Sequence, residues 1–441
     1  MANTTIANSD PRQVDATTRV SIWIDGEEQL FVEEYSIEND VLNVGDPFRI
    51  RVPNIDGRLA TAYSPGALCK IFMSDGAVAG GADITAVLGR VTGLDSQSDP
   101  QSGSTIMIAG ADLGWHLANS CAPMWIRLNG LKFSTLISRI IDPSWGIDAV
   151  GDSNALNRSL KQGRRDAETA LQKKQEKAAI DAAIREEEAA QAALGASALN
   201  LGSTGVQNRI AQLSNFGGFV PPVQIEPGQM VADLLVEFAR REQRLMNVSA
   251  TGVLQFFVPN DGTDGKAEYS IRLYKSTSEN RKRNNVKSAR VSRTIDGLYT
   301  KVICVGVAVM PPEFANPEDP NVGRFRGTFA ETDLGPIQES ILPFQRVFSF
   351  ADGDQYVQGM ARRRARWRFN RGRFDSLVAE YTVVGHTQNG LFWVPDSVVD
   401  VVDEVNGLKG KYYLSAVKYN RTRGEGTTSV LTLHELGYLG A

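Results

Sequence analysis

Short stretches that alternate apolar and polar residues limit the fold of this chain most strongly. Near the N-terminus, Phe48, Ile50 and Val52 alternate with Arg49 and Arg51. Successive side chains of a strand point to opposite faces, so this pattern predicts strands with one face in a core and the other toward solvent or a partner. Further strands are predicted near the C-terminus at 377–384, 397–402, 412–419 and 428–434. Both ends of the chain are therefore predicted to be β-rich.

The chain is too long for one hydrophobic core. It has 441 residues, and single cores stop growing at roughly 250 to 300 residues. The predicted fold class is mainly β with α+β parts. The predicted domains are a first β-barrel domain (1–125), a middle α+β domain (126–155 and 220–285), a helical insertion with a flexible loop (156–219), and a second β-barrel domain with a long loop and a basic helix (286–441).

The segment 156–199 has a different composition. It is rich in Ala, Gln, Glu, Lys and Arg and contains no proline, which predicts a helix. Large apolar residues are sparse, so this helix does not build a core of its own. Two interpretations stay open: a solvated surface insertion, or a protruding helix that docks on a neighbouring subunit through Leu171, Ile180 and Ile184.

Seven arginines gather in the predicted basic helix, at about 354–370 and just beyond. Arginines with interleaved aromatic residues can bind nucleic acid through phosphates and stacking. The alternative is a helix whose arginines pair with acidic groups of the same or a neighbouring subunit. The formal net charge of −4 favours this alternative. The candidate partner-binding residues here are Arg362, Arg363 and Arg366.

No sequence motif supports catalysis, a cofactor or a metal. The three histidines, His116, His386 and His434, form no zinc-binding pattern, and the chain contains no Walker A sequence and no GxSxG. The three scattered cysteines indicate no disulfide framework. We expect a non-enzyme without cofactors. A glycan or peptidoglycan hydrolase stays open as an alternative, because its two carboxylates meet only in three dimensions.

Nothing in the sequence predicts a membrane segment or a signal peptide. No apolar run is long enough to span a bilayer, and residues 1–19 are polar. We therefore expect synthesis in the cytoplasm and no membrane partner.

The two β-rich regions resemble each other weakly. Residues 45–52 lead into strands and then a long hairpin that closes at 111–114. Residues 394–401 lead in the same way into a hairpin that closes at 434–437. Two similar barrels in one chain would allow three chains to form a ring with six similar positions.

The order of these motifs resembles the central baseplate hub of contractile-tailed phages, the phage Mu-like tail hub family. The first barrel is similar through GRVTG at 89–93, IMIAGADLG at 106–114 and LANSCAP at 117–123. EPG at 226–228 resembles the family's middle unit, and 384–395 with 431–433 resembles its second barrel. The resemblance departs at about 156–219 and in the proline-rich loop at 311–343.

This resemblance implies a structural homotrimer with two tail-tube-like barrels per chain. The implied partners are the trimeric spike protein, tail tube or tube-initiator proteins, baseplate wedge proteins and the tape measure protein. Genomic DNA would pass through the bore without specific binding, so the bore is expected to lack the arginine cluster. The implied location is the virion baseplate, assembled in the host cytoplasm.

Overall fold

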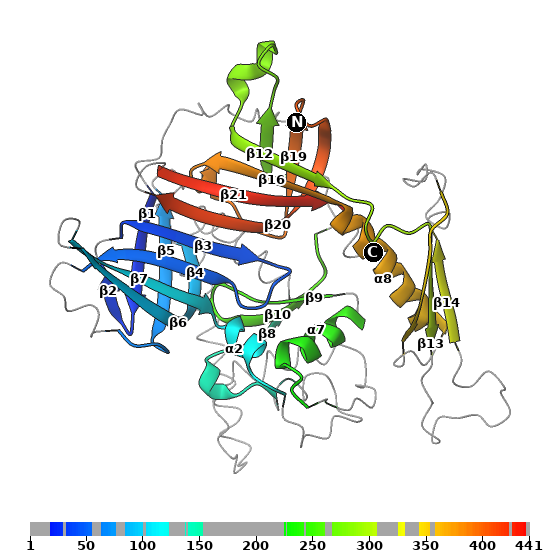
Figure 1. Ribbon diagram of the computed structural model, residues 1–441, viewed down its shortest axis with the longest axis horizontal. Helices are drawn as coiled ribbons and strands as arrows, with labels where there is room; N and C mark the ends of the chain where they lie inside the picture. The colour runs from blue at the N-terminus through cyan, green and yellow to red at the C-terminus, as the bar shows by residue number, and fades with distance from the viewer. Residues whose placement is uncertain are drawn as a thin grey trace, which may run out of the picture.

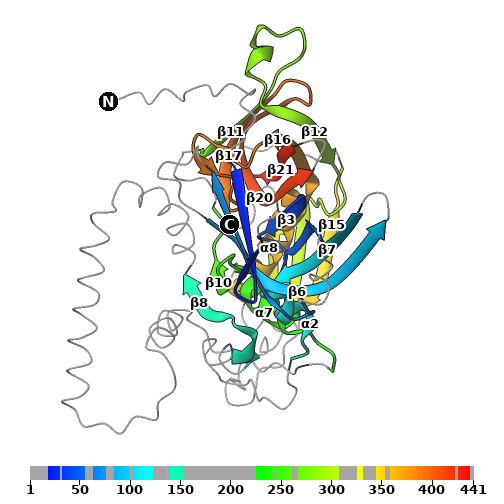
Figure 2. The same ribbon diagram turned by 90° about the vertical axis from the view of Figure 1, so that its left-hand side faces the viewer.

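The fold is seen in a computed structural model (Figure 1) and in a view turned by 90° (Figure 2). The described residues are 18–29, 32–54, 63–75, 84–99, 103–122, 137, 140–152, 225, 227–241, 244–260, 267–306, 325–330, 344–352, 358–422 and 426–437.

The N-terminal strands form what we call the first β unit. Its strands are β1 (Thr18–Ile24), β2 (Glu27–Gln29), β3 (Glu34–Asp40), β4 (Pro47–Pro53), β5 (Leu68–Asp75), β6 (Ile84–Asp99) and β7 (Gly103–Asp112). The predicted alternation is present: Phe48, Ile50 and Val52 are buried, whereas Arg49 is exposed. The predicted long hairpin is β6–β7.

The C-terminal strands form the second β unit. Its strands are β11 (Tyr269–Leu273), β12 (Val286–Arg293), β16 (Leu377–Val384), β19 (Ser397–Asp403), β20 (Leu408–Thr422) and β21 (Gly426–Glu435), with β17 (Thr387–Gln388) and β18 (Leu391–Phe392) as a short separate ribbon. β11 lies in the range expected for the middle domain, but it pairs in parallel with β19.

One pairing joins the two β units. β20 and β3 are antiparallel neighbours from Ala416 opposite Asp40 to Arg421 opposite Tyr35, and both strands lie side by side in Figure 1. The result is a 13-stranded sheet and one hydrophobic core that contains residues of both units. We call its central run, β12-β16-β21-β20-β3-β4-β7-β6, the shared sheet.

The two halves of the shared sheet have the same topology. One half has the strand order β6-β7-β4-β3, and the other has the order β20-β21-β16-β12. In both halves the first two strands form a long hairpin, and the second strand of the hairpin pairs with the third strand. The weak internal similarity was therefore predicted correctly for the hairpins. The predicted match between residues 45–52 and residues 394–401 was wrong. Residues 394–401 contribute to β19, which pairs with β20 in the same way that β5 pairs with β6. The counterpart of β4 is β16.

The middle of the chain forms a smaller α+β unit beneath the first β unit. It contains α2 (Gly114–Asn119), the 3-10 turn η1 (Pro143–Trp145), β8 (Asp148–Asp152), α7 (Val231–Arg241), β9 (Leu245–Val248) and β10 (Val253–Phe257). The predicted apolar helix face is present, since Leu234, Leu235 and Phe238 are buried in a separate core cluster.

A long helix and a second small sheet project from the second β unit (Figure 1). The helix is α8 (Gln358–Ser376), which carries the arginine cluster. Ala361, Ala365 and Phe369 pack it against the sheet of β13 (Lys301–Gly306), β14 (Phe325–Ala330) and β15 (Val347–Asp352). The segment 311–343 was predicted to be irregular throughout. This was wrong for β14, whose pairing with β13 is a tertiary contact that local composition does not indicate.

Candidate assembly surface

One face of the shared sheet is not covered by the core. The opposite face carries buried residues such as Ile37, Ile50 and Leu431. Most residues that alternate with these are half-buried or exposed, whereas Ala416, Thr428 and His434 at the same face of β20 and β21 are buried. The polar ones among the half-buried or exposed residues are Ser36, Glu38, Arg49, Arg51, Asp95, Gln97, Thr105, Arg290, Glu380, Thr382, Lys418, Asn420 and Thr432. This face, which we call the open face, is broad, polar and mixed in charge.

Opposite charges on the open face lie across neighbouring strands. The guanidinium of Arg51 lies 3.1 Å from the Glu34 carboxylate, and the Lys418 ammonium lies 3.7 Å from the Glu38 carboxylate. Partly exposed pairs of this kind contribute at most about 1 kcal/mol each to stability. Their larger consequence is electrostatic, because neutralised cations do not form the continuous basic track that grips phosphates.

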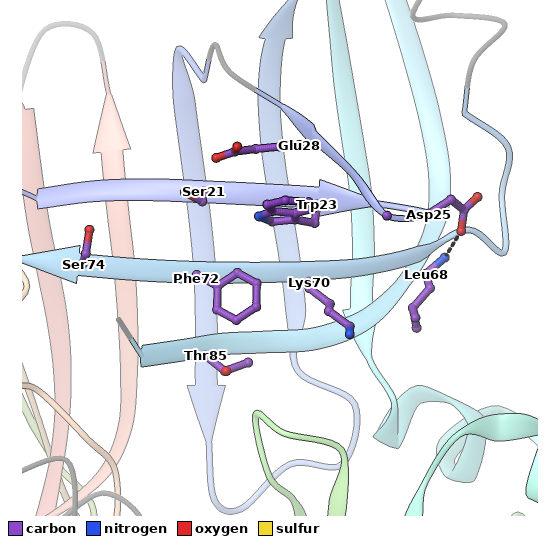
Figure 3. A pocket seen from close by; sticks show the side chains of 10 residues that line it. Ser21, Trp23, Asp25, Glu28, Leu68, Lys70, Phe72, Ser74 and Thr85 are labelled. Carbon is purple, nitrogen blue, oxygen red and sulfur yellow. Dashed lines mark hydrogen bonds between the residues drawn. The ribbon is translucent and has the colours of Figure 1, made fainter. Parts of the chain in front are cut away.

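The first β unit also has a recess lined by side chains of β1, β5 and β6 (Figure 3). Trp23 of β1 and Phe72 of β5 form its half-buried aromatic floor, with Lys70 and Glu28 beside them. The backbone amide of Leu68 donates to the Asp25 carboxylate over 2.9 Å at one end. The recess therefore combines an apolar floor with charged groups at its margin.

Most of the arginine cluster on α8 is engaged within the chain. Arg364 lies 3.2 Å from Glu237 of α7, and its guanidinium stacks 5.0 Å from the centre of the Trp367 ring. Arg368 lies over the Phe348 ring, and Arg371 pairs with Asp375 at 2.8 Å. The Arg364 and Arg368 contacts hold α8 to the middle unit and to the small sheet, whereas the Arg371–Asp375 pair lies within the helix.

The predicted partner-binding residues fall in two places. Arg362 and Arg363 are exposed on α8, and Arg366 is half-buried there. Leu171, Ile180 and Ile184 lie outside the described residues. Whether any of them binds a partner stays a prediction.

The three histidines have packing roles. His386 is buried between Tyr35 and Ser429, His434 stacks on Phe374, and His116 accepts from Arg90 at 3.0 Å. Burial, followed by the charge of Arg90, lowers the pKa of His116. No three His, Cys, Asp or Glu side chains within the described ranges are grouped to hold a metal ion.

Two buried carboxyl groups lie where the first β unit meets the middle unit. Asp46 precedes β4 and Asp112 ends β7; each is 4% exposed, and one oxygen of each has no hydrogen-bond partner. Burial, and for Asp46 the neighbouring Asp112, raises both pKa values, that of Asp112 to about 7. Sequence reasoning missed this pair, because its two members are far apart in the chain.

None of the described helices combines the length and apolar character needed to cross a membrane.

Comparison with known proteins tests the predicted resemblance. Residues 371–438, which hold most of the second β unit, match the NMB1110-like family model described as tail protein, C-terminal domain. The whole chain is similar to the crystal structure of the tail protein from Neisseria meningitidis MC58, with a TM-score of 0.63, 16% identity, and 96% of this chain and 98% of that chain covered. The chain has a tail-protein fold.

A second solved structure shares this tail-protein fold. The 43 kDa tail protein of prophage MuSo2 from Shewanella oneidensis matches with a TM-score of 0.59, 16% identity, and 95% of this chain and 98% of that chain covered. A search of curated protein sequences finds no match. The predicted mainly β fold and the resemblance to phage tail proteins are confirmed, at the level of fold for the chain and of a domain model for 371–438.

Proposed function

We propose that this chain is the central hub of a contractile phage tail baseplate. In this role it forms a homotrimer that joins the hexameric tail tube side to the trimeric spike and anchors the wedge proteins. The proposed location is the virion, after assembly in the host cytoplasm. Tube-initiator and tape measure proteins are further proposed neighbours.

The duplicated topology of the shared sheet carries this proposal. Each chain holds two antiparallel four-stranded halves that are joined edge to edge by β20 and β3. A heterologous contact that repeats by a closing rotation makes a ring. Three chains in such a ring present six similar halves on one side while keeping threefold symmetry in the rest of the chain. This is the geometry that an adapter between a sixfold tube and a threefold spike requires.

The open face is suited to line the bore. Its charged residues are mixed in sign and partly paired, so DNA could pass without being held by a row of unpaired cations. The arginine cluster is on α8, which packs on the small sheet, and several of its members have partners within the chain. We therefore expect the bore to lack the cluster.

Two assays test the proposal against its alternatives. Light scattering on the purified chain, alone and with the spike protein, should give three times the 48.1 kDa of one chain. A strict monomer in both samples would argue against a hub. Zymography on cell walls tests the hydrolase alternative, and clear lysis would overturn the structural reading. A DNA gel shift that disappears with added salt would support nucleic-acid binding through the basic helix.

A further inference from the structure

Two rows of side chains cross the recess of the first β unit, and each row has an aromatic ring at its centre. In the first row, Trp23 of β1 lies opposite Glu28 of β2 and opposite Lys70 of β5. All three side chains line the recess. The Trp23 ring therefore has a carboxylate on one side and an ammonium group on the other (Figure 3).

The second row has hydroxyl groups in place of the charges. Phe72 of β5 lies opposite Ser21 of β1 and opposite Thr85 of β6, and these three side chains also line the recess. Phe72 and Trp23 are diagonal neighbours on adjacent strands, a spacing at which large side chains reach each other. In Figure 3 the Phe72 ring is seen face-on and the Trp23 ring nearly edge-on, so the two rings offer separate apolar surfaces.

A bulge in β6 brings Thr85 to this position. The register between β5 and β6 shifts at Phe72, which lies opposite Thr85, whereas Ile71 lies opposite Val87. Ala86 and Val87 are each 1% exposed, so two consecutive residues of β6 are buried in the core. With regular pairing Ala86 would lie opposite Phe72 and would present a methyl group there. The bulge places a hydroxyl beside the ring instead, as bulges do where they redirect a side chain.

One end of the recess is formed by Asp25 in the turn between β1 and β2. Asp25 has a φ of +49° and Gly26 has a φ of +88°, the left-handed pair that a two-residue hairpin turn requires. The Leu68 amide donates to the Asp25 carboxylate over 2.9 Å, and the Asp25 amide donates to the Leu68 carbonyl over 2.9 Å. The carboxylate is therefore already held in place in the chain alone.

The size and chemistry of the recess fit a glycan. Its volume is about 1010 Å³, at the upper end of the range for ligand pockets. A pyranose ring has a face of C–H groups and an edge of hydroxyl groups. The negative face of an aromatic ring attracts partly positive C–H groups, while hydroxyls that leave water need hydrogen-bond partners. Each row of the recess supplies both, because an aromatic ring lies between two polar groups.

Two other classes of ligand fit less well. Protein interfaces have few charged residues in their buried centre, whereas Glu28 and Lys70 lie directly beside Trp23. Nucleic acid is held through its phosphates, and the carboxylates of Asp25 and Glu28 repel phosphates. A sugar hydroxyl accepts a hydrogen bond from an ammonium group and donates one to a carboxylate, so a glycan uses both charges.

We propose that the recess binds a glycan segment of two or more pyranose rings. One ring lies against Trp23, with its hydroxyls bonded to Glu28 and Lys70. The next ring lies against Phe72, with its hydroxyls bonded to Ser21 and Thr85. This inference goes beyond the proposed hub role and does not require a trimer, because the whole site lies within one chain.

Saturation-transfer NMR on the full chain tests the binding. The probes are oligomers of N-acetylglucosamine, of glucose and of galacturonic acid, each with one to four rings, which separate cell-wall-like, neutral and acidic glycans. At least one series should bind with a Kd of about 1 mM or less, and its affinity should rise by roughly tenfold or more from one ring to two. No saturation transfer to any series at about 10 mM overturns the proposal. Equal affinity for one ring and two overturns the two-ring site.

Variants locate the bound glycan. Trp23→Ala should weaken binding by roughly tenfold, and Lys70→Ala by roughly threefold or more. Trp115→Ala is the matched control, because Trp115 is 38% exposed and does not line the recess; this variant should bind like the parent chain. Binding that survives both recess changes, or that Trp115→Ala weakens to the same degree, overturns the site.

A milder pair of changes keeps the test independent of folding. Thr85→Val removes a hydroxyl from the recess and keeps the size of the side chain, and it should weaken binding by roughly threefold. Thr92→Val makes the same change at an exposed position of β6 that does not line the recess, and should bind like the parent. Thermal unfolding midpoints of both variants confirm that they fold. Equal affinity of the two folded variants overturns the second row of the site.

Discussion

The hydroxyl of Tyr35 donates a hydrogen bond to Nε2 of His386 over 2.8 Å, linking β3 of the first β unit to the turn that follows β16 in the second. The tautomer of His386 follows from its other neighbour. The Ser429 hydroxyl donates to the carbonyl of Gly385 at 2.8 Å, so it accepts from Nδ1 of His386 at 2.9 Å. Nε2 is then the acceptor for Tyr35. A buried, directional bond of this kind fixes how the two units meet.

Replacement of Tyr35 by phenylalanine should destabilise the chain. The change removes the donor to a buried ring nitrogen, which typically costs about 1–3 kcal/mol. Urea unfolding measures it. Tyr412→Phe is the matched control, because this tyrosine is half-buried on β20 and its hydroxyl has no hydrogen bond among the described residues. Equal losses in the two variants would remove the special role of the Tyr35–His386 bond.

Asp112→Asn should change how stability depends on pH. Burial raises the folded-state pKa of Asp112 to about 7, above the roughly 3.9 of an unfolded aspartate. The contribution of protonated Asp112 to the free energy of unfolding is therefore fully present below about pH 4. This contribution is lost as the pH rises through 7, by up to about 1.4 kcal/mol per pH unit. The neutral amide removes this loss.

Thermal unfolding between pH 5 and pH 8 checks the expectation. Asp112→Asn should be more stable than the parent chain at pH 8, with a smaller difference at pH 5. Asp112 is the buried neighbour of Asp46, and the carboxyl groups of Asp40 and Glu38 also lie near Asp46. Asp46 and Asp112 therefore titrate as a unit. Asp25→Asn, an exposed aspartate in the β1–β2 turn, is the control. A parallel pH profile for Asp112→Asn and the parent would contradict the expectation.

Gly89→Ala should be far more damaging than Gly93→Ala in the same strand. A methyl group at Gly89 would lie 2.1 Å from the carbonyl oxygen of Ala111 on β7, whereas one at Gly93 would meet nothing within 4 Å. The backbone of a paired strand moves little to relieve such a clash. We therefore expect the free energy of unfolding to fall by about 1–3 kcal/mol or more in Gly89→Ala and by about 0.5 kcal/mol or less in Gly93→Ala. Denaturant midpoints of the two purified variants compare them directly.

Arg364→Ala should loosen α8 from the middle unit. It removes the ion pair with Glu237 and the stacking on Trp367, a combined loss of about 1–2 kcal/mol. Arg363→Ala, one position earlier and exposed, should stay within about 0.5 kcal/mol of the parent. Hydrogen exchange localised to α7 and α8 separates a local effect from a global one. Identical exchange in both variants would contradict this role of Arg364.

Sequence patterns predicted most of the individual elements. The alternation at 48–52 and 377–384 identifies β4 and β16, because a half-buried strand must place apolar side chains at every second position. The apolar face around Leu234 and Phe238 identifies α7 for the corresponding helical reason. The order of motifs was sufficient to indicate the phage tail hub resemblance.

The candidate surface was much less predictable. The alternation predicts that a strand has a polar face, but it does not say which polar faces lie side by side. Lys418 and Glu38 are distant in sequence and meet only because β20 pairs with β3. The sequence likewise did not indicate which arginines of α8 are exposed and which have partners in the chain. Only the tertiary structure shows that Arg364 pairs with Glu237 and that Arg368 lies over Phe348.

By itself, the sequence determined the β-rich class, the hairpins and the absence of recognised catalytic motifs, because these depend on spacing along the chain. The tertiary structure decided the β20–β3 junction, the parallel pairing of β11 with β19, and the buried neighbours of His386 and Asp112. Strand pairing between distant segments depends on which edges and core faces fit one another in space. That fit is a property of the folded chain, so no local pattern contains it.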